Sequence, residues 1–159
     1  MQFIMNINIE KIKKDIIENI NNIRQTKILN NNDIDVEFQD KPHFAPKVLP
    51  VGKMAVYCFI YNNQFLKIGK VNKYSKARYC SQHYNSNSSK SNLAKSLLND
   101  SELNNMFNKD NIGDWIKQNT SRINFLIRED LGIFILNFIE SYLHLKFTPK
   151  YEGYKKQRK

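Results

Sequence analysis

Glu140 is the only acidic residue in the apolar stretch from Leu131 to Tyr151. The stretch predicts a helix that ends before Pro149, because a residue that precedes proline disfavours the helical conformation. An ionised carboxylate on an apolar helix is costly unless it pairs with a cation or binds a metal ion. His144 lies one turn further on the same face. The residues leave open whether Glu140 forms a salt bridge to a Lys or Arg, pairs with His144, or holds a metal ion.

A tyrosine and a lysine that could act on a substrate lie on a predicted β-hairpin. The β-branched and aromatic run 55–61, the turn at 62–63 and the run 64–69 predict two antiparallel strands. The first strand carries Tyr57 and the second carries Lys67. Each side chain taken alone is also compatible with an ordinary role, a core aromatic for Tyr57 and a solvated face for Lys67.

The register of this hairpin decides whether Tyr57 and Lys67 share one face of the sheet. A strict two-residue loop would place them on opposite faces, because side chains alternate along a strand. A three-residue loop over 62–64, or a β-bulge, would place them on the same face. We predict the three-residue loop, which pairs Phe59 with Lys67.

Further elements follow the hairpin. Ser75 can cap a short helix through Tyr84, which carries Arg78 and His83. After the polar loop 85–90, the sequence predicts a second short helix capped by Ser91, a helical turn over 114–119, a third strand over 123–128 and the helix of Glu140.

The ordered set of these motifs resembles the GIY-YIG nuclease family over positions 54–153. Val56-Tyr57 and Lys67-Ile68-Gly69 match the two strand motifs, Arg78 follows on a helix, and Glu140 precedes a Pro-x-Tyr sequence at 149–151. Some residues depart from the family pattern. Ala55 stands for the first Gly, Lys67 replaces a Tyr as in some restriction-enzyme members, and Glu152 replaces an Asn. The His or Tyr expected one turn after Arg78 is Gln82, and His83 is the next residue.

The resemblance implies Mg²⁺-dependent hydrolysis of phosphodiester bonds, by a restriction-type DNA endonuclease. Glu140 would hold Mg²⁺, with Mn²⁺ as a substitute, and Arg78 would bind the non-bridging phosphate oxygens. Tyr57 would be the general base, with a pKa lowered by the metal and by nearby cations. Lys67 would assist Tyr57 or neutralise the phosphate, and His83 completes the expected catalytic set. The residues expected to contact DNA are Lys70, Lys73, Lys76, Asn87, Lys90, Asn92 and Lys95.

The composition is compatible with such a partner. The chain has 159 residues, a formal net charge of +10 and a pI near 9.6, which favour nucleic acid first and an anionic membrane surface second. The longest uncharged apolar run, 131–139, is too short to cross a bilayer. The first residues do not resemble a secretory signal, and Cys58 and Cys80 are expected to be reduced thiols. We therefore expect a cytoplasmic protein that does not enter the membrane.

The expected fold class is α+β, with a small, mainly antiparallel three-stranded sheet flanked by helices and preceded by an N-terminal helical extension. Isoleucines at helical spacing predict an amphipathic helix over 9–24, which packs on the domain or forms a homodimer contact. We place the extension and an irregular linker at 1–52, the nuclease-like domain at 53–153 and a basic tail at 154–159.

Two other functions fit the same residues. The first is a non-catalytic nucleic-acid-binding protein on a degenerate nuclease fold, which the residues Lys67 and Glu152 favour. The second is an interaction or structural protein in which the positive charge is compositional and Glu140 is merely paired.

Overall fold

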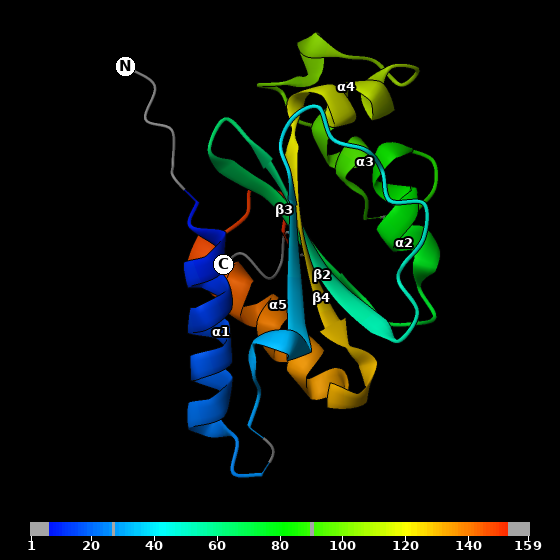
Figure 1. The fold of residues 1–159 in the computed structure, drawn as a ribbon. Helices are drawn as coiled ribbons and strands as arrows, with labels where there is room; N and C mark the ends of the chain where they lie inside the picture. Colours follow the sequence, from blue (N-terminus) through cyan, green and yellow to red (C-terminus); the bar gives the residue numbers. More distant parts are fainter. Residues whose placement is uncertain (1–6, 27, 90, 153–159) are drawn as a thin grey trace.

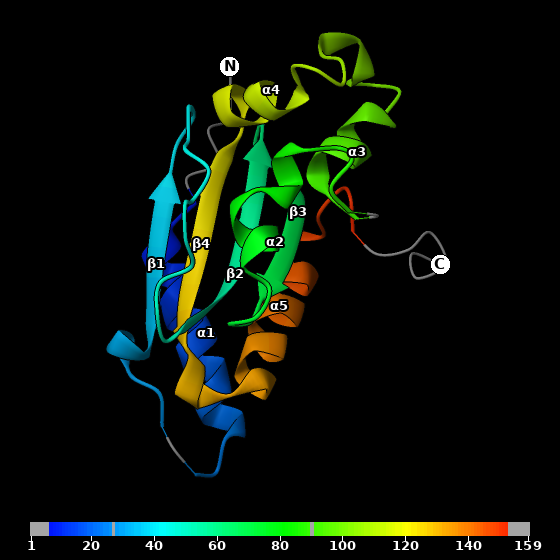
Figure 2. The same cartoon turned by 90° about the vertical axis from the view of Figure 1, so that its right-hand side faces the viewer.

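The fold is built on one antiparallel sheet. The computed structural model of the chain describes residues 7–26, 28–89 and 91–152. In these residues four strands pair in the order β1-β4-β2-β3. Figure 1 shows the sheet nearly edge-on, and Figure 2 shows the four strands side by side. The strands are β1 (Ile34–Gln39), β2 (Lys53–Tyr61), β3 (Gln64–Val71) and β4 (Ser121–Arg128). The α+β class is confirmed. The expected three-stranded sheet is wrong, because a fourth strand, β1, forms in the segment that was expected to be irregular.

Helices cover both faces of the sheet (Figures 1 and 2). One face carries α1 (Ile9–Ile23) and α5 (Ile133–Phe147). The other carries the shorter helices α2 (Lys76–Cys80), α3 (Leu93–Leu98) and α4 (Ile112–Asn119). Single 3₁₀ turns lie at Asn31–Asp33, Gln82–Tyr84, Asn104–Met106 and Glu129–Leu131. The central strand β2 is therefore buried on both faces, which explains its nearly continuous apolar sequence.

The β2–β3 hairpin has a two-residue turn and a bulge. Asn62 and Asn63 have φ values of 46° and 63°, the left-handed conformation of a type I′ turn, which Asn tolerates. The expected three-residue loop is therefore wrong. The register shifts between Phe59 and Ile60, however, so Phe59 still pairs with Lys67. A bulge, the second of the two possibilities considered for the hairpin, thus produces the expected pairing.

The isoleucine face of α1 is covered by its own chain. Ile12, Ile16 and Ile20 are buried in the same core as residues of the sheet and of α5. The side chain of Asn8 caps the helix by accepting a hydrogen bond from the Lys11 amide at 2.9 Å. Of the two roles predicted for this face, the structure shows packing on the domain, so the three buried isoleucines are not available for a homodimer contact.

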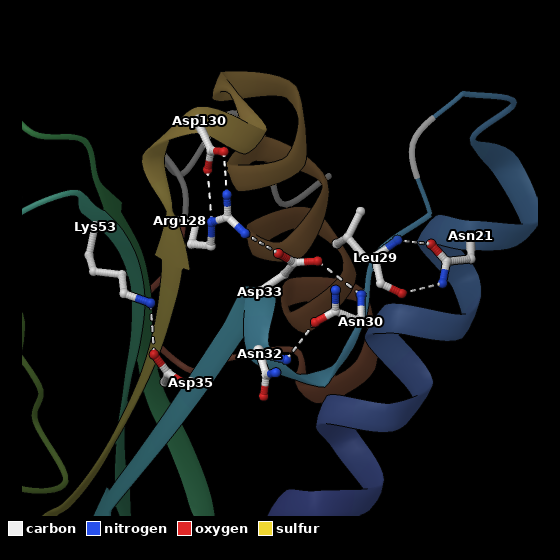
Figure 3. Close-up of polar contacts among 9 residues, drawn as sticks. All are labelled: Asn21, Leu29, Asn30, Asn32, Asp33, Asp35, Lys53, Arg128 and Asp130. Carbon is white, nitrogen blue, oxygen red and sulfur yellow. Dashed lines mark hydrogen bonds and ion pairs between the residues drawn. The ribbon is translucent and has the colours of Figure 1, made fainter.

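Hydrogen bonds and ion pairs connect the segment between α1 and β1, and β1 itself, to the neighbouring strands (Figure 3). The buried carboxylate of Asp33 accepts hydrogen bonds from the Asn30 amide and from Arg128 Nη1 of β4, both at 2.9 Å. Asp35 of β1 forms an ion pair with Lys53 of β2 at 2.7 Å. The expected boundary near residue 52 therefore divides two parts that share one sheet and one core.

Helix α5 lies where the sequence predicts it. It begins after Gly132, whose φ is 87°, and ends before Pro149. Across the described parts of the chain, no helix combines the length and apolar character needed to span a membrane.

Replacing Ile16 with Ala tests whether α1 is part of the core. Ile16 is fully buried, so the truncation should lower the free energy of unfolding by about 2–5 kcal/mol. Ile23→Ala on the same helix is the matched control, because Ile23 is 69% exposed and should change stability by at most about 0.5 kcal/mol. Urea denaturation measures both, and equal effects would contradict the packing of α1 on the sheet.

Candidate active site

Tyr57 lies across a glycine of the neighbouring strand. Tyr57 pairs with Gly69 in the β2–β3 register, and its side chain is fully buried. A Cβ atom at Gly69 would lie 2.5 Å from the Tyr57 hydroxyl oxygen, which is closer than side-chain contacts allow. Because β3 is an edge strand, the absence of a side chain at Gly69 lets the phenol extend towards the edge of the sheet.

Two nitrogen atoms contact the Tyr57 hydroxyl oxygen. Arg78 of α2 donates a hydrogen bond from Nε at 3.0 Å, and His83 contacts the same oxygen through Nε2 at 2.6 Å. Nδ1 of His83 accepts a hydrogen bond from the Leu93 amide at 3.1 Å. The structure thus brings together three of the expected catalytic residues, although His83 stands one residue beyond the family position.

Burial dominates the protonation of this cluster. It raises the pKa of Tyr57 to about 12, although Arg78 and Arg122 lower that pKa and Glu140 raises it. The nearby cations lower the pKa of Tyr57 as expected, but desolvation exceeds their effect, so the pKa is raised overall. Burial also places the pKa of His83 well below its ordinary value, and nearby cations lower it further. At neutral pH both side chains are uncharged.

Lys67 lies on the same face of the sheet as Tyr57, as a consequence of the bulge. Its side chain is almost fully buried, and Nζ donates to Ser91 Oγ at 3.4 Å and to the Tyr151 carbonyl at 3.3 Å. Lys67 also contributes to the low pKa of His83, so its charge reaches the cluster.

Glu140 approaches the cluster from the opposite face of the sheet. It forms an ion pair with Lys70 of β3, with 2.7 Å between Oε2 and Nζ. The salt bridge that the sequence left open is therefore present, and both side chains are partly exposed. Glu140 still influences the pKa values of Tyr57 and Arg78, which places its charge within electrostatic reach of both.

Glu140 is the residue that the sequence predicted to hold a metal ion. In the ranges that the structure describes, no group of three or more His, Cys, Asp or Glu side chains could hold a metal ion. A metal ion here would have the single carboxylate of Glu140 and would take its other ligands from water or substrate, as Mg²⁺ often does. In this structure the ammonium group of Lys70, at 2.7 Å, is the cation that contacts the carboxylate.

Glu152 joins the C-terminal segment to the edge of the sheet. The segment hydrogen-bonds to β3 through two backbone amides, from Lys150 to Phe65 O at 2.9 Å and from Tyr151 to Leu66 O at 2.8 Å. Glu152 continues this pairing, because its Oε1 accepts a hydrogen bond from the Ile68 amide at 2.7 Å. The acidic residue at the family's Asn position thus satisfies a backbone donor of the edge strand.

His144 is placed beside Glu152. Its Nε2 lies 3.4 Å from Glu152 Oε2 and 3.3 Å from the Ile68 carbonyl. Of the residues that could pair with Glu140, the structure therefore selects Lys70. A cavity of about 260 Å³ opens at this end of α5, lined by His144, Thr148, Pro149, Lys150 and Glu152.

The residues expected to contact DNA divide into four groups. Lys73, Lys76, Asn87 and Lys95 are exposed, and Lys70 pairs with Glu140. Asn92 is buried, and its side chain caps α3 by accepting from the Lys95 amide at 2.7 Å. The side chain of Asn92 is thus used inside the fold and is not exposed for the predicted contact with DNA. Lys90 lies outside the described residues.

Arg122 of β4 is a buried cation near Tyr57 that was not among the site residues predicted from the sequence. It is fully buried and donates to Asn124 Oδ1, to the Tyr84 hydroxyl oxygen and to the Tyr79 carbonyl, each at 2.8 Å. Its guanidinium carbon lies 5.4 Å from the centre of the Tyr57 ring. The signal was the alternation of Arg122 and Asn124 in an otherwise apolar strand, which places both polar residues on the face that carries Tyr57.

No family model, curated protein or solved structure matches the chain.

Replacing Gly69 with Ala tests the contact between Gly69 and Tyr57. The added methyl group collides with the phenol, so the free energy of unfolding should fall by about 1–3 kcal/mol. In a Tyr57→Leu background the phenol is gone, and the same change should cost much less. A double-mutant cycle by urea denaturation measures the difference. A coupling energy near zero would contradict the close approach.

Proposed function

We propose that the chain is a Mg²⁺-dependent endonuclease of the GIY-YIG type that hydrolyses phosphodiester bonds in DNA. The observation that carries the proposal is the convergence of Arg78 and His83 on the hydroxyl oxygen of Tyr57, with the charge of Glu140 within reach. A tyrosine held by two nitrogen atoms beside a carboxylate suits proton transfer at a charged substrate.

In the proposed reaction, a water molecule attacks phosphorus and gives a proton to the phenolate oxygen of Tyr57. The P–O bond opposite the attack breaks, and the leaving oxygen takes a proton from solvent water. Arg78 holds the Tyr57 oxygen through Nε and directs its Nη groups to the non-bridging phosphate oxygens. Glu140 would hold Mg²⁺, which supplies Lewis-acid stabilisation of the phosphate when bound. The ammonium of Lys67 is buried on the face of the sheet that carries Tyr57 and would add positive charge that offsets the charge of the phosphate.

DNA is the proposed substrate because the chain carries a net charge of +10 and exposes Lys73 and Lys76 near α2. The restriction type rests on the resemblance, in which Lys67 matches some restriction enzymes. Cleavage of both strands with one site per chain requires two copies or two successive cuts. A second copy would have to use a surface other than the isoleucine face of α1.

A non-catalytic nucleic-acid-binding protein is the second candidate function. The ion pair between Glu140 and Lys70 favours it, because a carboxylate that already has a cationic partner needs no metal ion. The two functions differ in their response to Mg²⁺, since only the enzyme converts supercoiled plasmid into cut forms with Mg²⁺ and not with EDTA.

Glu140→Gln and Lys70→Met separate two possible roles of Glu140, metal binding and ion pairing with Lys70. Both variants break the same ion pair, but only Glu140→Gln removes the metal-binding carboxylate. We expect Glu140→Gln to lower the rate of plasmid cleavage by at least about 1,000-fold while DNA retention in a filter-binding assay persists. Lys70→Met should lose no more than about tenfold in rate, the effect of one lost phosphate contact.

Thermal unfolding of both variants provides the control. If Glu140 is only a structural partner, Glu140→Gln will melt early and still cut at the rate of the unaltered chain. That result would overturn the proposed metal site. Plasmid that stays intact with Mg²⁺, together with salt-dependent DNA binding, would favour the non-catalytic function.

The pH dependence of cleavage tests Tyr57 as the base. Burial raises the pKa of Tyr57 to about 12, so below that value the phenolate fraction rises about tenfold per pH unit. The single-turnover rate should therefore rise with pH through the neutral and alkaline range. Tyr57→Phe keeps the ring and should lower the rate by about 100-fold or more, with a flatter profile. An unchanged rate and slope in this variant would remove Tyr57 from the mechanism.

A further inference from the structure

We propose that the backbone amide of Leu93 fixes His83 as the tautomer that carries its proton on Nε2, so that His83 positions Tyr57 as a hydrogen-bond donor and is not a base. The proposal deepens the proposed function, since only its effect on cleavage rests on nuclease activity. The tautomer itself follows from the hydrogen bonds within the fold.

The first step concerns the direction of the hydrogen bond at Nδ1. The Leu93 amide is a donor, and it lies 3.1 Å from His83 Nδ1. Nδ1 must therefore be the unprotonated, accepting nitrogen of the ring. A neutral imidazole carries its single proton on the other nitrogen, so Nε2–H donates to the Tyr57 oxygen at 2.6 Å.

The second step concerns the rigidity of the Leu93 amide. Leu93 is the first residue of α3, and the helix is capped by the buried side chain of Asn92. Asn92 accepts from the Lys95 amide at 2.7 Å, and its Nδ2 donates to the Ser89 carbonyl at 2.9 Å. These bonds hold the start of α3 against the preceding loop, and the Leu93 amide is directed at His83 as a result.

The third step excludes the doubly protonated ring. A cationic His83 would place a second N–H at Nδ1, directly opposite the Leu93 N–H, and two donors cannot share one hydrogen bond. Among the described residues, the charged groups that act on the pKa of His83 are cations: Lys67 from β3, Arg78 from α2 and Arg122 from β4. His83 is therefore unable to take the proton of Tyr57.

The two nitrogen donors also determine where the hydroxyl proton of Tyr57 is directed. Arg78 Nε and His83 Nε2 both donate to the phenol oxygen. In the described part of the chain the hydroxyl proton then has no acceptor, so it is directed away from both donors. The two donors also stabilise the phenolate when that proton is lost.

The tautomer can be measured directly by ¹⁵N NMR. The chain has only three histidines, and protonated and bare ring nitrogens differ widely in ¹⁵N chemical shift. We expect His83 to show a bare Nδ1 and a protonated Nε2 from neutral pH down to the acid limit of the fold. A His83 that is protonated on Nδ1, or that becomes cationic near its ordinary pKa, would overturn the proposal.

Leu93→Pro removes the amide proton that fixes the tautomer. Proline is well tolerated at the first position of a helix, and Asn92 has the extended conformation required before proline, with φ −125° and ψ 161°. Leu93→Ala is the matched control, because it loses the same buried side chain but keeps the amide. We expect the Nδ1–H tautomer to become populated in Leu93→Pro and to stay absent in Leu93→Ala.

Cleavage is the second readout. Leu93→Pro should cut DNA about tenfold more slowly than Leu93→Ala, the effect of one lost hydrogen bond at Tyr57. If Leu93→Pro does not fold, the spectrum of the unaltered chain decides the tautomer. A chain that shows the Nε2–H form but cuts no DNA supports the tautomer and overturns the proposed function. An identical His83 spectrum in Leu93→Pro and Leu93→Ala would overturn the role of the amide.

Discussion

The bulge in the β2–β3 hairpin is the constraint on which the candidate site depends. The two-residue turn at Asn62 and Asn63 alone would place Tyr57 and Lys67 on opposite faces of the sheet. The register shift between Phe59 and Ile60 exchanges the faces of the sheet that the side chains of β3 before and after the bulge would otherwise occupy. Both Tyr57 and Lys67 therefore lie on the face that α2 and α3 cover. The same shift directs Lys70 to the other face, where it meets Glu140. One extra residue in one strand thus decides which charges lie near the phenol.

The edge position of β3 explains how groups on two faces of a sheet can act together. Gly69 leaves room for the Tyr57 phenol at the edge, and Lys70 and Glu140 approach the same edge from the other face. The C-terminal segment limits that edge, since the amides of Lys150 and Tyr151 hydrogen-bond to β3. This pairing also protects the exposed backbone groups of β3 from association with other strands.

Local sequence patterns predicted the helices and strands that carry the site. They did not predict which residues far apart in the chain pair with one another. The hairpin strands and the Glu140 helix follow from apolar runs and turn residues in the sequence. The pairing of Phe59 with Lys67 was predicted through a three-residue loop, whereas the structure produces it through a bulge that no local pattern indicates. Strand β1 alternates apolar and polar residues as well, but the prolines after it indicated a linker, and only its pairing with β4 makes it a strand. The contact between Leu93 and His83 joins a backbone amide to a ring, and a side-chain pattern carries no information about it.

The buried charge of Arg122 is what makes the donor role of His83 consistent with the rest of the site. A buried guanidinium is costly, and here neutral acceptors and aromatic ring faces compensate it. Its charge lowers the pKa of His83 and also that of Tyr57. Both effects favour the same protonation pattern, a neutral His83 that donates and a Tyr57 oxygen that receives. Since Arg78 adds a second donor to that oxygen, both nitrogen donors that contact it stabilise negative charge at one atom.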